Sequence, residues 1–281
     1  MGAFQKTGEF WRQFKKNKAA EISLYITVIF ILLAVFAPWV SPYDPFALGT
    51  ESFLPPQRGH WMGTDDLGRD SMSRVFYGTR VSLAVGILAA GTSLVIGMLI
   101  GSCAGYFGGF SDNLLMRLAE YFLVIPRFFL ALLIVAMFGT GIGKIILIIG
   151  VLGWPEIARV VRAQFLTLKE REFVLAARAM GQRSRSIIFS EILPNAIPPA
   201  IVVGSFLVAR AILLEAGLSF LGLGDPTVVS WGSLLRDAQD QMRISPWMVL
   251  FPGLALSLMV LALNLFGDGI NDVLNPKLKE K

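Results

Sequence analysis

The chain has 281 residues, of which 54% are hydrophobic and only 16% are charged. Soluble domains carry about 25% charged residues, so this composition excludes an ordinary soluble protein and indicates an integral membrane protein. The net charge of +5 follows membrane topology in such a chain and is no sign of nucleic-acid binding.

Six apolar stretches match the roughly 20 residues that a helix needs to cross a bilayer. They lie at 22–40, 81–106, 115–138, 142–161, 196–217 and 247–267. We therefore predict an all-α polytopic membrane protein with six transmembrane helices. The first stretch is too long for a cleavable signal peptide and lacks a small-residue cleavage site, so we expect it to remain as an anchor.

Before the first span, residues 1–21 form a basic leader with interleaved aromatic residues, which suits an interfacial helix better than nucleic-acid binding. The turn-rich segment 41–78 is expected to be an external loop. Its single histidine among carboxylates lacks the spacing of a metal site. We therefore expect ion pairing and turn closure, and no metal, from His60, Asp65, Asp66 and Asp70.

Glycines recur every four residues in the second span, at Gly97, Gly101 and Gly105. Such spacing puts three bare backbone patches on one helix face, where another helix can approach closely. We predict a packing seam, with a flexible hinge as the alternative. Cys103 in the same span is expected to be a small packing residue.

Charged residues within the third and fifth spans are candidates for the transport pathway or an interface, because charges at membrane depth avoid lipid. In the third span, Glu120 and Arg127 are seven residues apart and should share a helix face, with Pro126 as a kink. In the fifth, Arg210 and Glu215 point about 140° apart. Each is therefore expected to find a partner on another helix.

No catalytic residues are expected in this chain. The segment Gly139–Lys144 resembles a phosphate-binding loop, but its glycine spacing is one residue short and Ile145 replaces the hydroxyl residue. A nucleophile elbow and a metal-ligand cluster are also lacking in the sequence.

The longest polar and basic segment, 162–194, separates the fourth and fifth spans. An apolar stripe at helical spacing is formed by Val161, Phe165, Leu168, Leu175 and Ala179. Gly181 then favours a turn, a short apolar run follows, and Pro194 is expected to stop it. The pattern predicts a helix, a turn and a second short helix. The residues alone also allow a basic helix on the inner leaflet.

Ala176, Ala177, Gly181, Leu193 and Pro194 stand at the spacing of a known signature. The segment resembles the cytoplasmic loop of ATP-binding-cassette (ABC) importer permeases, from which it departs at Leu175 and Glu191. Three other stretches resemble the dipeptide, oligopeptide and nickel subgroup, and in particular its C-type permease subunit. They are residues 60–70, 218–232 and 264–272.

This resemblance implies a type I ABC importer permease fold and contact with an ATPase through the 162–194 loop. The implied coupling residues are Ala176, Ala177, Arg178, Gly181, Leu193 and Pro194. It also implies a second homologous permease, two cytoplasmic ATPase subunits that hold ATP and magnesium, and an external substrate-binding protein. Dipeptides or oligopeptides would be the substrates, with nickel or small glycans as alternatives. A stand-alone secondary transporter or channel is the rival class, but the inverted repeats that it predicts are not visible in the sequence.

Charge distribution predicts the orientation. With the N-terminus inside, sixteen Lys and Arg residues fall in cytoplasmic segments and seven in external ones, so both termini should face the cytoplasm of a bacterial or archaeal cell. We expect a leader (1–21), a first helix with its external loop (22–80) and a five-helix permease domain (81–281).

Overall fold

A computed structural model describes residues 11–274, and among these it contains helices but no β-strand. The all-α prediction is confirmed, and residues 1–10 of the predicted leader lie outside the described residues. The helices in chain order are α2 (Lys18–Val40), α3 (Ser71–Phe107), α4 (Gly109–Val124), α5 (Arg127–Phe138), α6 (Ile142–Leu168), α7 (Glu172–Ala179), α8 (Ser184–Ser186), the π-helical turn η1 (Ile187–Ile192), α9 (Leu193–Phe220), α10 (Trp231–Asp237), the 3-10 turn η2 (Gln239–Gln241) and α11 (Trp247–Leu274).

Length and composition allow four described segments to cross a membrane: α2, α3, the continuous stretch Ser184–Phe220, and α11. The pair α4 and α5 makes up to a fifth span. Helix α6 is 27 residues long, but its charged residues Lys144, Glu156, Arg159 and Arg162 set it apart from the other long helices. The structure therefore shows four or five spans, and the count of six stays a prediction.

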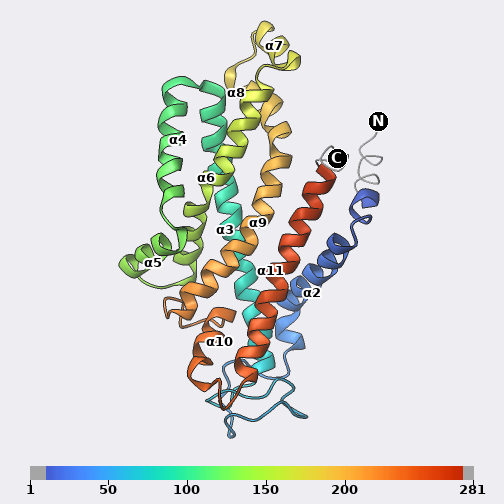
Figure 1. Cartoon of the computed structure of the whole chain (residues 1–281), viewed down its shortest axis with the longest axis vertical. Coiled ribbons are helices and arrows are strands. Elements are labelled where there is room, and N and C mark those ends of the chain that lie inside the picture. Colours follow the sequence, from blue (N-terminus) through green and yellow to red (C-terminus); the bar gives the residue numbers. More distant parts are fainter. Residues whose placement is uncertain (1–10, 275–281) are drawn as a thin grey trace.

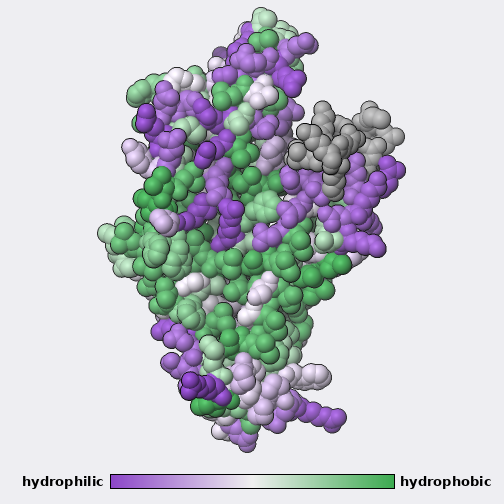
Figure 2. All heavy atoms as spheres, in the orientation of Figure 1, coloured by the Kyte–Doolittle hydropathy of each residue, from purple (hydrophilic) through white to green (hydrophobic). Residues whose placement is uncertain are grey.

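The helices lie side by side along the long axis of the molecule (Figure 1). Helix α3 packs along α6, α9 contacts both, and α2 and α11 pack against each other and against this group. The start of α2, the end of α11 and α7 lie at one end, whereas α10 and the 41–70 loop lie at the other. Figure 2 shows a hydrophobic zone between more hydrophilic ends, as a membrane protein requires.

The close approach of α3 and α6 depends on the three glycines of the second span. A Cβ atom added to Gly97 would lie 2.5 Å from Ile157 Cβ, one on Gly101 would lie 2.5 Å from the Ala158 carbonyl oxygen, and one on Gly105 would lie 2.5 Å from Phe165 Cβ. Real Cβ atoms do not approach so closely, so this face requires glycine. Cys103 is exposed, so the expected packing role for it within this chain is wrong.

A single helix over 115–138 is not what the structure shows. Helix α4 ends at Val124, α5 begins at Arg127, and the axes of the two helices make an angle of 90°. Proline has no N–H and disfavours the helical conformation in the preceding residue, and Ile125 is accordingly extended. The predicted kink at Pro126 is therefore a break. Glu120 and Arg127 lie on different helices, so the prediction that they share a face is wrong.

Two other helix boundaries differ from the prediction. Helix α3 begins at Ser71, ten residues before 81, because the Asp70 carboxylate accepts the Ser73 N–H at 2.8 Å and caps the helix. The second boundary is at Pro194, which was expected to stop the short helix after Gly181 but does not. The chain continues through the wide π-helical turn η1 into α9, where Pro194 lies in the first turn and proline is tolerated.

Candidate functional site

Helix α7 lies in the segment between α6 and α9, and it is followed by a turn at Gly181. Gly181 has φ of +76°, which favours glycine, and its N–H donates to the Arg178 carbonyl at 3.0 Å. The N–H of Gln182 donates to the Ala177 carbonyl at 3.1 Å, so the pair forms a Schellman motif. The predicted turn is confirmed. A Cβ at Gly181 would meet nothing within 4 Å, so the constraint is the backbone conformation.

Helix α7 has one buried face, and its exposed surface carries several apolar side chains beside the charged Glu172 and Arg178. Val174 and Ala177 are buried against a core that includes Ile187 and Ile188. The exposed apolar residues, which we call the α7 face, are Phe173, Leu175, Ala176, Ala179 and Met180. Such a surface at one end of the molecule is suited to contact with another protein.

The single apolar stripe predicted from Val161 to Ala179 is wrong. Helix α6 ends at Leu168, and a turn separates it from α7. Val161 and Phe165 are buried on α6, whereas Leu175 and Ala179 are exposed on α7. Because the turn reorients the chain, the three- and four-residue spacing does not continue from one helix to the next.

Three basic side chains connect α6 and α7 to the end of α3 and the start of α4. Arg162 pairs with Asp112 through two hydrogen bonds, of 2.5 and 2.6 Å. Lys169 Nζ donates to the Gly105 carbonyl at 3.3 Å. Arg178 lies over the Tyr106 ring, 5.5 Å from its centroid, at a cation–π distance. Arg178 thus joins α7 to α3, and Arg162 and Lys169 join the end of α6 to α4 and α3.

The two remaining residues of the predicted coupling set lie where η1 meets α9. Leu193 is partly buried and packs against the same core as Val174 and Ala177. Pro194 is exposed. The structure therefore divides the predicted set between residues that hold the loop together, such as Ala177, and residues open to a partner, such as Ala176.

A charge cluster joins α5, α6 and α9. Arg127 Nη2 donates to Glu156 Oε1 at 3.0 Å, and Arg210 Nη1 lies 2.9 and 2.8 Å from the two oxygens of the same carboxylate. The expected partner of Arg210 on another helix is thus Glu156. Sequence reasoning missed Glu156, although an acidic residue within an apolar stretch was the same signal that identified the other candidates.

The other two candidate charges lie apart from this cluster. Glu120 is exposed on α4, without an ion pair in the described part of the chain. Glu215 is 1% exposed and accepts a hydrogen bond from the Ser219 hydroxyl at 2.6 Å, with Ser82 and Ser230 also beside it. Glu215 therefore lies in the interior of this chain, beside hydroxyl groups of its own helix α9, of α3 and of the residue that caps α10.

The 41–70 loop is held by ion pairs, as the sequence predicts. Asp65 is buried and accepts hydrogen bonds from the N–H groups of Leu67 and Arg69, at 2.9 and 2.8 Å. Its carboxylate also pairs with Arg69 Nε at 2.7 Å and with Arg74. Arg74 in turn contacts Asp237, the last residue of α10, at 3.1 Å. The network connects the loop to both α3 and α10.

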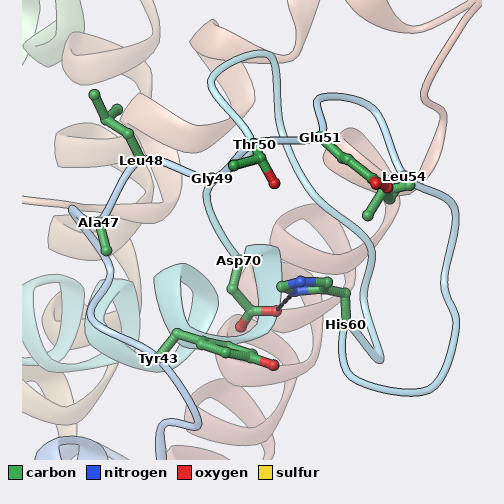
Figure 3. Close-up of a pocket in the computed structure, with 10 residues that line it drawn as sticks. Tyr43, Ala47, Leu48, Gly49, Thr50, Glu51, Leu54, His60 and Asp70 are labelled. Atoms are coloured by element: carbon green, nitrogen blue, oxygen red, sulfur yellow. Dashed lines mark hydrogen bonds and ion pairs between the residues drawn. The ribbon is translucent and has the colours of Figure 1, made fainter.

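A cavity of about 300 Å³ lies in the same loop, and Figure 3 shows the residues that line it. His60 Nδ1 lies 2.9 Å from Asp70 Oδ1, and the His60 ring stacks on Tyr43 with centroids 4.9 Å apart. Asp70 is also the α3 cap. His60 and Asp70 thus close the loop onto the start of α3, as expected from the sequence.

A larger cavity of about 520 Å³ lies between this loop and α10, with Asp66, Arg69, Asp225 and Arg236 among its lining residues. Hydrogen bonds from the Thr227 hydroxyl, from the Ile142 N–H and from the Thr227 N–H lower the pKa of Asp225 below its usual range. The hydrogen bond from Ile142 also connects the start of α6 to the segment that follows α9.

Several helices that can cross a membrane define a multi-pass membrane protein. The family model of the binding-protein-dependent transport system inner membrane component matches residues 93–280. The model of the N-terminal transmembrane domain of oligopeptide transport permease C matches residues 7–56. The chain belongs to the family of inner membrane components of binding-protein-dependent transport systems. It is a permease subunit of the ABC importer type, a transport component and not a catalytic one.

Three relatives are similar over nearly the whole chain. The dipeptide transport system permease DppC of Alkalihalophilus pseudofirmus is 40% identical over 96% of this chain and 90% of its own length. The oligopeptide transport system permease OppC of Bacillus subtilis is 37% identical over 98% and 92%. The glutathione transport system permease GsiD of Pectobacterium atrosepticum is 37% identical over 96% and 91%.

A solved structure of the MetNI methionine ABC transporter contains a chain with a similar fold. The TM-score is 0.57 at 19% identity, and the match covers 72% of this chain and 97% of that one. At this identity the match shows the fold alone, which is the type I ABC importer permease fold expected from the sequence.

Proposed function

We propose that this chain forms half of the membrane passage of an importer for dipeptides or oligopeptides. The names of its relatives support peptides as the substrate class. The assembly would include a second homologous permease, two ATPase subunits and an external binding protein. ATP and magnesium would be held by the ATPases, and this chain would bind no cofactor.

The observation that carries the coupling role is the exposed α7 face, which lies on a helix that contacts α3 and follows directly after α6. An amphipathic helix docks by burying its apolar side in a partner groove. If the ATPases bind the α7 face, their closure would move α7. The Arg162–Asp112, Lys169–Gly105 and Arg178–Tyr106 contacts would transmit that movement to α3 and α4, and so switch the passage between outward and inward openings.

We expect Ala176→Glu to weaken ATPase association by about tenfold or more, because it places a charge in the centre of the docking surface. Ala176 is exposed, so this substitution leaves the packing of α7 intact, unlike one at the buried Ala177. Co-purification of the ATPases and peptide-stimulated ATP hydrolysis are the measurements. Thr167→Glu adds the same charge at an exposed position of α6 and should have no effect. Full association and coupled transport in Ala176→Glu would refute the coupling role.

The proposed orientation places both termini and α7 in the cytoplasm and the 41–70 loop outside, in accordance with the charge distribution. We expect an impermeant thiol reagent to label Asp66→Cys but not Gln182→Cys in intact cells. The native Cys103 is exposed, so Cys103→Ser is the required background. Labelling of position 182 without labelling of position 66 would reverse the topology.

A further inference from the structure

Arg210 has unused binding capacity within the charge cluster. Two guanidinium groups and one carboxylate give the cluster a net charge of +1. The Arg210 side chain is 58% exposed, compared with 22% for Arg127 and 26% for Glu156. Only Nη1 of Arg210 donates to Glu156. Within the described residues, the Nε and Nη2 donors of Arg210 have no acceptor, so they are free for a ligand.

The position of Arg210 argues that its exposed side does not face lipid. It lies ten residues before the end of α9 at Phe220, which corresponds to about 15 Å of helix and to about half of the hydrocarbon core. An arginine at such depth faces protein or water, because lipid strongly disfavours the charge. The exposed N–H groups therefore point toward a water-filled passage or a partner.

A ligand must approach Arg210 from this exposed side. The cleft beside the two arginines, between α3, α6 and α9, is lined by Ala89, Ser93, Gly153 and Leu207 and has a volume of only about 20 Å³. That space holds a water molecule but not a peptide. Binding would therefore involve the outward-facing N–H groups and not an internal pocket.

We propose that Arg210, positioned by Glu156, binds the carboxylate of the transported peptide midway through the membrane; this inference rests on the proposed function. Every peptide with a free C-terminus has this group, whatever its side chains, so the site suits a transporter of varied peptides. Arginine offers a planar pair of donors that matches a carboxylate. Glu156 already engages one nitrogen and reduces the cluster charge from +2 to +1, which favours release, and a transport site must bind weakly enough to let its ligand leave.

The test compares a dipeptide with its C-terminal amide, chosen so that the wild-type importer takes up both. The complete importer is reconstituted in vesicles with its binding protein, and the ratio of acid to amide uptake is measured. We expect Arg210→Gln to lower this ratio about tenfold, since one charge-assisted pair is lost. Arg210→Lys should restore part of it. The ratio of acid to amide uptake in each variant is divided by the wild-type ratio. This removes any preference of the binding protein for the acid or the amide.

Arg159→Gln is the matched control, because Arg159 is exposed and lies on α6 one turn after Glu156. The substitution therefore removes a positive charge close to the cluster. It should leave the ratio unchanged. An equal fall in acid and amide uptake in Arg210→Gln, or the same ratio change in Arg159→Gln, overturns the inference and leaves the proposed function standing. Loss of complex assembly in Arg210→Gln, with assembly retained in Arg159→Gln, would also overturn the inference, because Arg210 would then act in a subunit contact. If the wild-type importer carried no peptide at all, both proposals would fall.

Discussion

Replacing Asp65 with Asn is expected to lower the stability of the 41–70 loop by about 3 kcal/mol. Asp65 is 2% exposed, and Arg74, which it neutralises, is 5% exposed. The substitution keeps the side-chain volume but leaves a buried guanidinium without its nearest carboxylate. Asp237, 3.1 Å from Arg74, still contributes some neutralisation, so we expect the lower part of the range for a broken buried pair.

Hydrogen exchange in the purified importer measures this effect directly. A loss of about 3 kcal/mol corresponds to an increase of about 100-fold in the exchange of the loop amides that open together. Asp66→Asn is the matched control, because the neighbouring Asp66 side chain is 40% exposed and lies 3.6 Å from Arg69. Exposed pairs contribute about 0 to 1 kcal/mol. Similar exchange in the two variants would show that the Asp65 network does not hold the loop.

Gly101→Val is expected to destabilise the packing of α3 against α6 by about 3 kcal/mol. The new Cβ would lie 2.5 Å from the Ala158 carbonyl oxygen and 2.8 Å from Val161 Cβ. Since backbone atoms of α6 cannot rotate away as a side chain does, the two helices must separate, and overpacking of this kind costs about 1 to 3 kcal/mol or more. Because α6 leads into α7, separation should also impair coupling.

Gly91→Val in the same helix provides the control, because a Cβ at Gly91 meets nothing within 4 Å. The thermal unfolding midpoint of the detergent-purified protein should fall by several degrees for Gly101→Val and change little for Gly91→Val. Equal midpoints for the two variants would mean that the seam tolerates side chains and that the helices are not in close contact there.

Local sequence patterns determined much of this protein. Long apolar stretches predicted helices, because a helix satisfies its own backbone hydrogen bonds in lipid. The spacing of Gly97, Gly101 and Gly105 placed three bare positions on one face, and Gly181 marked a turn that requires a positive φ. These features depend on neighbours a few residues apart. The signature in the 162–194 loop could also be recognised from the sequence, because its residues are close together in the chain.

Tertiary structure alone decided how distant residues meet. Pro126 signalled a kink, but the 90° angle between α4 and α5 depends on the helices packed around it. Arg127, Glu156 and Arg210 come together from three helices, and no spacing in the sequence encodes that contact. In α7, packing against Ile187 and Ile188 buries Ala177 and leaves Ala176 exposed. Burial is set by which elements pack together, so a local pattern predicts a helix but not which of its faces remains free for a partner.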